Sequence, residues 1–247
     1  MKTIRIFGTR GLILATALGV SVGIGVTSPA FAQKLPVIVN PDGKVTYLGT
    51  LGGSYSTTYD INDAGQVVGN SDTAAGHDHA FITDPNGMGM RDLGTLGGTS
   101  SYALGINNSG QVVGETYTLY GSSYAFVTGP DGMGMRELGS SFGGSSRAYD
   151  INDSGQVVGQ VDGSHSSIAS DAFITDPDGM VMRELSSIAD LPNGRFLSNA
   201  QGINDQGQVL AIAFVSNIPK PASYALMLAG LGLVGFMTRS KKAIAAH

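Results

Sequence analysis

The sequence has 247 residues, a formal net charge of −5 and no cysteine. This length allows one large domain or two small ones, and the lack of cysteine excludes disulfides and thiolate metal sites. The charge is uneven, because residues 33–218 hold all 19 acidic residues against seven basic ones, a net charge of −12. A segment this acidic repels phosphate backbones, so nucleic acid is not expected as a partner.

The N-terminal residues have the three parts of a secretory signal peptide. Residues 1–10 are basic, residues 11–26 are apolar, and Ala30-Phe31-Ala32 precedes Gln33. A basic start, an apolar middle and two small residues at Ala30 and Ala32 are typical of a signal helix and its cleavage site. We therefore predict a signal peptide over residues 1–32, a mature chain that starts at Gln33, and export. A retained membrane anchor is the alternative.

A nine-residue motif recurs along the middle of the chain. The first copy, residues 61–69, reads Ile-Asn-Asp-Ala-Gly-Gln-Val-Val-Gly, and further copies start at Ile106, Ile151 and, more loosely, Ile203. The starts lie 45, 45 and 52 residues apart, which indicates a repeat array. Asn or Asp before Gly predicts a turn and Val-Val a strand, so each copy predicts a β-hairpin.

A second hairpin signal alternates with the first. Residues 80–83 read Ala-Phe-Ile-Thr and are followed by Asp84-Pro85-Asn86-Gly87, with related copies around Pro41, Pro130 and Pro177. This pattern predicts a type I turn closed by a left-handed glycine. Four hairpins of each type give about sixteen short strands, and residues 33–216 show no helical periodicity.

Four strands in about 45 residues are the size of one propeller blade. We therefore predict that residues 33–216 form an all-β domain of about eight hairpins, specifically a small four-bladed β-propeller. In this arrangement the two ends of the array together complete one split blade and close the ring. A β-solenoid or a stacked sandwich is the alternative, because the number of hairpins does not fix their arrangement.

The repeats resemble a known family. Residues 79–81 (His-Ala-Phe), 92–98 (Asp-Leu-Gly-Thr-Leu-Gly-Gly) and 105–114 are similar to the HAF repeat of extracellular bacterial proteins, and the similarity covers most of residues 37–211. The other copies carry Tyr124 and Asp171 in place of His79. We therefore expect the Ala-Phe pair to be structural and the preceding position to be exposed. The resemblance implies no particular reaction.

The C-terminal residues 217–247 contain a second targeting segment. Pro219-Lys220-Pro221 precedes an apolar stretch, residues 222–238, which ends at a basic cluster of Arg239, Lys241 and Lys242. Seventeen residues are the short end of what spans a bilayer as a helix, and the basic cluster is expected to stay in the cytoplasm. We therefore predict a transmembrane helix at 222–238. A buried core helix is the alternative.

This C-terminal pattern resembles the PEP-CTERM sorting signal, with Lys220 where the family has Glu. The resemblance implies an exosortase-like protease as a partner, which removes the tail after at least transient anchoring in the inner membrane of a Gram-negative-type bacterium. Bacteria with this system generally make exopolysaccharide. The expected location is therefore the cell surface or the extracellular matrix.

Chemistry is expected where the copies differ, because a reaction centre is not built fourfold. His77 and His79 occur in one copy only and, two residues apart on a strand, could face one metal ion. No third ligand is evident, so we predict no metal site and interpret the pair as part of an exposed polar loop. A calcium loop is not expected, because Ala64 and Ser71 occupy ligand positions. We predict no catalytic residue and no cofactor.

Three functions remain open at this stage. The leading hypothesis is a non-enzymatic structural or interaction protein of the cell envelope or exopolysaccharide layer. The second is a glycan-binding module that uses exposed tyrosines, with the candidates Tyr55, Tyr59, Tyr102, Tyr117, Tyr120, Tyr124 and Tyr149. The third is a propeller-type hydrolase or lyase, which requires the histidine pair or unique carboxylates to meet in one pocket.

Overall fold

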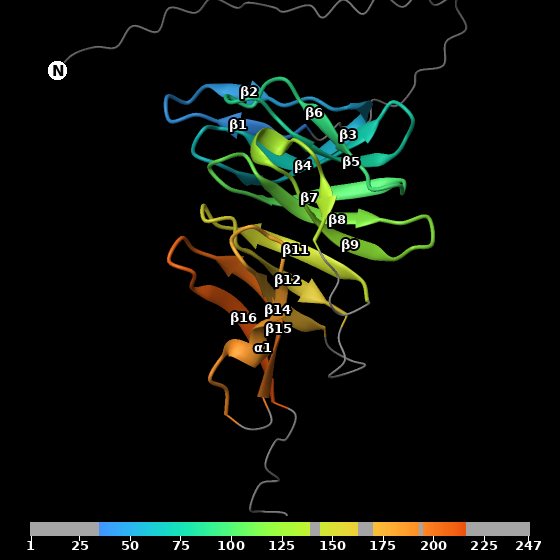
Figure 1. The fold of residues 1–247 in the computed structure, drawn as a ribbon. Helices are drawn as coiled ribbons and strands as arrows, with labels where there is room; N and C mark the ends of the chain where they lie inside the picture. The colour runs from blue at the N-terminus through green and yellow to red at the C-terminus, as the bar shows by residue number, and fades with distance from the viewer. Residues whose placement is uncertain (1–34, 139–143, 163–169, 193–194, 216–247) are drawn as a thin grey trace, which may run out of the picture. The chain divides into compact units, whose positions relative to one another are not determined.

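The computed structural model describes residues 35–138, 144–162, 170–192 and 195–215, whose strands form five antiparallel sheets (Figure 1). The predicted signal peptide with Ala30, Ala32 and Gln33 lies outside these residues. So do the sorting motif at Pro219, Lys220 and Pro221, the predicted helix 222–238 and the basic cluster. No helix in the described part of the chain is long and apolar enough to cross a membrane.

Three of the sheets have four strands in chain order and are called blades 1 to 3. Blade 1 contains β3 (Gly52–Ile61), β4 (Val67–Thr73), β5 (Asp78–Ile82) and β6 (Arg91–Gly94). Blade 2 contains β7 (Ser100–Ile106), β8 (Val112–Tyr117), β9 (Ser123–Val127) and β10 (Arg136–Glu137). Blade 3 contains β11 (Ser146–Ile151), β12 (Val157–Val161), β13 (Asp171–Thr175) and β14 (Met182–Glu184).

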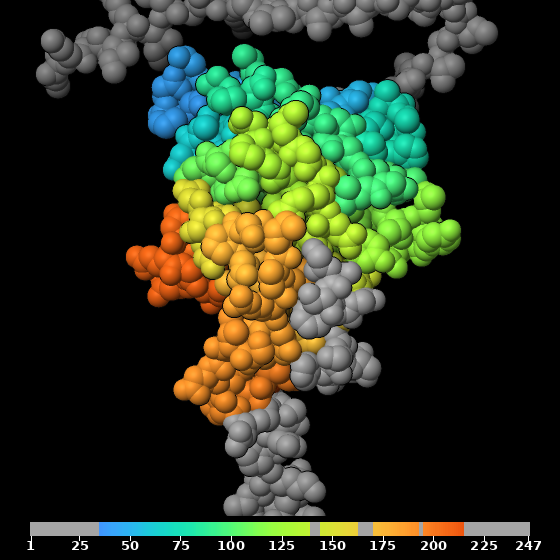
Figure 2. Space-filling model, viewed as in Figure 1, coloured from blue at the N-terminus to red at the C-terminus, as the bar shows by residue number. Residues whose placement is uncertain are grey.

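The other two sheets are half-blades at the two ends of the array. The first consists of β1 (Val37–Val39) and β2 (Val45–Tyr47), and the last of β15 (Arg195–Ile203) and β16 (Val209–Val215). The described residues thus contain sixteen strands, four hairpins of each type, as the sequence predicts. Blades adjacent in the sequence are adjacent in space (Figure 2): β7 contacts β4 and β5, β11 contacts β8 and β9, and β15 contacts β12 and β13.

The prediction that the ends close a four-bladed ring within the chain is wrong. The pair β1–β2 and the pair β15–β16 form separate sheets. Ile38 and Leu48 of the first half-blade pack against blade 1, whereas the last half-blade packs against blade 3. The two pairs are therefore separate half-blades, one beside blade 1 and the other beside blade 3.

The core consists of the repeated apolar residues between the blades. Phe81, Phe126 and Phe173 are fully buried together with the alanine that precedes each of them, which confirms that the Ala-Phe pair is structural. The position before the pair is exposed in no copy. His79 and Tyr124 are half-buried and Asp171 is buried, so that expectation is wrong. The reason is that the third strand of each blade is not an edge strand, because it pairs with the second strand on one edge and with the fourth strand on the other.

The last glycine of the nine-residue motif allows a close approach between two strands. A Cβ atom at Gly69 would lie 1.9 Å from the carbonyl oxygen of Thr57, and Gly114 and Gly159 have the same relation to Tyr102 and Arg147 at 1.9 and 2.0 Å. Any side chain would therefore push the first two strands of the blade apart. These three glycines therefore recur because the two strands pack closely there.

The second hairpin type departs in part from the predicted type I turn. Asn86 and Asp131 have positive φ angles of 87° and 54°, so in two copies the residue before the glycine is itself left-handed. Asn and Asp tolerate this conformation because their short side chains bond the local backbone. Two short helical segments interrupt the strands: the 3-10 helix η1 (Pro130–Gly132) and the single-turn α1 (Leu185–Ile188), which no helical periodicity announces.

Candidate functional site at the non-repeating rim

Because neighbouring strands are antiparallel, the turns between them lie at two opposite ends of the blades. The nine-residue turns at 62–66, 107–111, 152–156 and 204–208 lie at one end, which we call the ladder end. The turns at 74–77 and 118–122 join the second and third strands of blades 1 and 2 at the opposite end, which we call the rim. Residues of one type thus recur at the ladder end, while residues that differ between copies gather at the rim.

Asparagine side chains connect the blades at the ladder end. The Nδ2 of Asn62 donates to the carbonyl oxygen of Asn107 at 3.1 Å, Asn107 donates to Asn152 at 3.0 Å, and Asn152 donates to Asn204 at 3.1 Å. The Oδ1 of each asparagine accepts a backbone N–H from its own turn. One side chain therefore shapes the turn and joins the next blade, which explains why it recurs in every copy.

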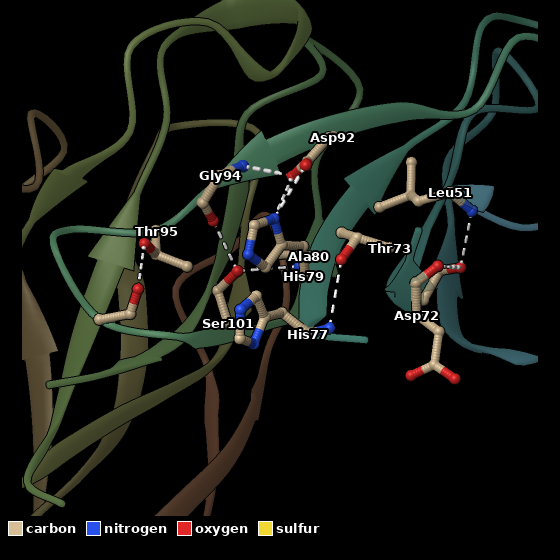
Figure 3. Close-up of polar contacts among 12 residues, drawn as sticks. Leu51, Asp72, Thr73, His77, His79, Ala80, Asp92, Gly94, Thr95 and Ser101 are labelled. Carbon is tan, nitrogen blue, oxygen red and sulfur yellow. Dashed lines mark hydrogen bonds and ion pairs between the residues drawn. The ribbon is translucent and has the colours of Figure 1, made fainter. Parts of the chain in front are cut away.

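His77 and His79 lie at the rim, before and within β5 (Figure 3). Their rings are nearly parallel, at 11°, with centroids 6.3 Å apart, as expected for alternate residues of one strand. The Nδ1 of His79 lies 2.8 Å from an oxygen of Asp92 on β6. In the described residues no group of three His, Asp or Glu is placed to hold a metal ion. The contact with Asp92 accounts for the orientation of His79 without a metal.

Asp78, between the two histidines, gathers polar side chains from two blades. The Oη of Tyr55 donates to Asp78 at 2.5 Å, the Nδ2 of Asn70 donates to the same oxygen at 3.2 Å, and the Oη of Tyr102 on blade 2 lies 3.5 Å from the other oxygen. The bond to Asp78, followed by burial, raises the pKa of Tyr55 above its ordinary value. Burial and the charge of Asp78 also raise the pKa of Tyr102. Both phenols stay protonated beside a carboxylate.

A shallow groove of about 330 Å³ adjoins this cluster on blade 2. Tyr102 and Tyr117 line it with their rings edge to face and centroids 5.9 Å apart. Of the seven tyrosines singled out in the sequence, Tyr55, Tyr59 and Tyr120 are exposed and Tyr102, Tyr117, Tyr124 and Tyr149 are half-buried. None of these rings is packed into the core, so they remain candidates for contact with a ligand.

An ion pair between blades 2 and 3 also lies at the rim, and the sequence reasoning missed it. The guanidinium of Arg147 lies 2.6 Å from Oε1 of Glu115, whose side chain is only 6% exposed. Burial disfavours the charge of Arg147, but the bond and the attraction to Glu115 outweigh burial and raise the guanidinium pKa. Oε2 of Glu115 is buried without a partner, and the pair lines a polar groove of about 190 Å³ with Ser123 and Gln160.

The repeat register contains the signal that could have found this pair. Thr57, Tyr102 and Arg147 are equivalent positions on the first strand of each blade, and each lies directly opposite Asn70, Glu115 or Gln160 on the second strand. Two adjacent positions that change character in every copy, within strands that otherwise repeat, indicate side chains that are not needed for the fold. A search for metal ligands alone passes over Glu115 and Arg147.

Small antiparallel sheets of four strands, stacked in chain order, define a fold of the β-propeller type. Among solved structures the chain is similar to one assigned as TolB from Agrobacterium tumefaciens, with a TM-score of 0.52 and 13% sequence identity. The match covers 77% of this chain and 66% of that one, so the chain spans just under two thirds of the length of its structural neighbour. No family model and no curated protein matches the chain.

Proposed function

We propose that this chain is an exported, non-enzymatic interaction protein of the cell envelope or exopolysaccharide layer. The basic and apolar N-terminus and the Pro-Lys-Pro motif, apolar stretch and basic tail support export and sorting. The propeller-type fold supports a display role, because its blades form a rigid frame for the residues at their ends. The HAF-type repeat and the sorting signal, with an exosortase-like protease as partner, are part of this proposal.

The observation that carries an interaction role is the character of the rim. Its non-repeating side chains form an open surface made of the Tyr55–Asp78–Tyr102 cluster, the groove beside Tyr117 and the Glu115–Arg147 pair. Each charged group there already has a partner in the protein. Side chains held in this way are already positioned to recognise a ligand.

Glycan binding is the form of interaction that the rim favours. A sugar ring has an apolar C–H face and polar edges, so it is recognised by an aromatic ring with nearby hydrogen-bonding groups. Tyr102 and Tyr117 offer such rings, and Asp78 accepts hydrogen bonds beside them. A second polar groove lies beside the groove of these rings, lined by Ser123, Arg147 and Gln160 among others. We infer that exopolysaccharide is the ligand class.

Two measurements test this proposal. Peptide mass spectrometry of the surface, membrane and secreted fractions is expected to find no peptide beyond Pro221 in the surface or secreted form. Co-sedimentation with purified exopolysaccharide is expected to show binding that Tyr102→Ala weakens and Tyr47→Ala, an exposed tyrosine of the first half-blade, leaves unchanged. Release of shorter glycans during the incubation would contradict a non-enzymatic role, and retention of residues 239–242 at the surface would contradict the sorting step.

A further inference from the structure

The two half-blades leave the array with two unfinished ends. At the first end, a groove of about 310 Å³ lies between β1 and the ladder-end half of β3, lined by Val37, Val39, Tyr59 and Ile61 among others. At the last end, Leu210, Ile212 and Phe214 of β16 are exposed. Exposed apolar residues on strands that carry unpaired backbone groups are a docking surface or an aggregation hazard.

Inside the array, the same repeat positions are covered. Ile61 is 51% exposed, whereas its equivalents Ile106 and Ile151 are 6% and 3% exposed, because an earlier blade packs against them. Leu210 is 66% exposed, whereas its equivalents Val68 and Val113 are fully buried, because a third strand pairs beside them. At the first end of the described residues, the first two strands of a preceding blade are missing, so Ile61 is left uncovered. At their last end, the last two strands of the blade are missing, so Leu210 is left uncovered.

The ladder of asparagines is unfinished in the same sense. In the described residues Asn204 uses its Nδ2 only within its own turn, on Gln208, where the earlier copies also reach the next blade. At the other end, the carbonyl oxygen of Asn62 receives only the N–H of Gly65, whereas that of Asn107 receives the side chain of the preceding copy as well. One end of the ladder offers a donor and the other an acceptor.

On the first strand of each blade, a Tyr-Asp pair alternates with a pair that ends in Gly. This alternation would continue if the last blade of one copy met the first blade of another. Successive copies carry Tyr59-Asp60, Leu104-Gly105, Tyr149-Asp150 and Gln201-Gly202. A Cβ atom at Gly105 would lie 2.9 Å from the carbonyl oxygen of Tyr149 in the next blade. At Gly202 the nearest atom is a carboxylate oxygen of Asp150 at 3.6 Å, and among the described residues no blade follows. The glycine of one blade thus leaves room for the Tyr-Asp pair of the next blade. The first blade carries such a pair, Tyr59-Asp60, which would fit beside Gly202 of another copy.

We propose that copies of this chain associate head to tail, with β15–β16 of one molecule docked beside β1 of a second to form a shared fourth blade. The register between β16 and β1 follows from the complete blades. In blade 1, Gly69 of the second strand lies opposite Phe81 of the third strand. The equivalent residues of the shared blade are Ala211 and Val37 of the partner subunit. Where two copies join at both ends, the ring closes, and a head-to-tail interface that does not close continues as a filament.

One contact of the complete blades is absent from the shared blade. Thr83, Thr128 and Thr175 accept the N–H of the first valine of the second strand through their hydroxyls, and Val39 stands at the equivalent position. The shared blade therefore depends on backbone pairing between β16 and β1 and on apolar contact. This is consistent with an interface that assembles from two preformed halves.

Cross-linking tests the register, because the chain has no cysteine of its own. Val37→Cys and Ala211→Cys are placed on two full-length chains with tags of different size, solubilised together from membranes. Cβ atoms of directly opposed residues lie about 5 Å apart, within reach of a disulfide. We expect a mixed disulfide-linked dimer of the two tags, and little when Tyr120→Cys, at a fully exposed rim turn, replaces Ala211→Cys. A double variant that forms only an internal disulfide overturns the proposal.

A glycine substitution tests the interface without disturbing the blade. Gly202→Val has room within one chain but would strike a docked second copy at Tyr59 and Asp60. We expect light scattering of the full chain to give a dimer or larger assembly for the wild type and a monomer for Gly202→Val, with a circular dichroism spectrum that shows the same strand content. A monomeric wild-type chain, or an assembled Gly202→Val chain, overturns the proposal whether or not the protein binds glycan.

Discussion

The ladder end and the rim are built from the same strands but follow opposite rules. At the ladder end four asparagines, Asn62, Asn107, Asn152 and Asn204, each bond their own turn in the same way. The first three also bond the following blade. At the rim the equivalent positions change from copy to copy, and the contacts between blades are made by a different pair each time, Asp78 with Tyr102 and then Glu115 with Arg147.

This difference teaches that one end carries the fold and the other is free to carry function. A side chain that must serve every blade cannot vary, because each blade is stabilised only through its neighbours. The rim is not bound by that requirement, since the strands there already pair along their backbones. The comparison leads to four predictions, which run from the ladder end to the most exposed part of the rim.

The largest effect is expected for Asn107→Ala at the ladder end. Asn107 is 3% exposed, and its loss removes bonds to its own turn and to Asn152. Buried groups left without partners cost roughly 1–3 kcal/mol each, so we expect about 3 kcal/mol less stability in urea unfolding. Asn204→Ala is the matched control, because Asn204 is exposed and no blade follows it in the described part of the chain, and it is expected to cost less than about 1 kcal/mol. Equal costs would contradict the ladder.

A smaller loss is expected for Glu115→Ala at the rim. The substitution leaves Arg147 partly buried without its partner. Breaking a fully buried pair costs about 3–5 kcal/mol and an exposed pair below about 1, so we expect about 2 kcal/mol because the Arg147 side chain is 36% exposed. The double variant Glu115→Met with Arg147→Met is expected to regain most of this stability in the same urea titration. A double variant as unstable as the single one would argue against an isolated pair.

The third effect is the pH dependence of the hydrogen bond between Tyr55 and Asp78. The bond to Asp78 raises the pKa of Tyr55, so this bond contributes fully below the ordinary phenol pKa of about 10 and is lost as pH rises through the raised value. Ultraviolet titration is expected to show a phenol that ionises late. That late step is expected to vanish in Tyr55→Phe and to move to lower pH in Asp78→Asn, and to remain in the control Tyr120→Phe.

The smallest effect is expected for His79→Ala. His79 bonds only Asp92 at the edge of the rim, so we expect a change in unfolding free energy within about 0.5 kcal/mol. Zinc is expected to leave the melting temperature of the wild type unchanged, because the described residues provide no third ligand. A zinc-dependent rise in melting temperature that His77→Ala removes would show that the pair holds a metal after all.

The turns of the ladder end were accessible to sequence reasoning, whereas the contacts between blades at the rim were not. The spacing of the nine-residue motif predicts the turns, the number of strands and the pairing within each blade, because these depend on local residues. It misses the Glu115–Arg147 pair and the Asp78 cluster, which join strands of different blades. It also wrongly predicts that the two half-blades pair with each other. The angle between successive blades decides this, and that angle depends on side-chain packing such as that around Gly105.

The most direct test of the division between the two ends is a binding measurement on matched variants. Exopolysaccharide affinity is to be compared by affinity electrophoresis for the wild type, the rim variant Tyr102→Ala and the ladder-end variant Asn204→Ala. We expect the rim variant to bind about tenfold more weakly, which corresponds to about 1.4 kcal/mol, and the ladder-end variant to bind as the wild type does. Loss of binding in Asn204→Ala with full binding in Tyr102→Ala would contradict the assignment of function to the rim.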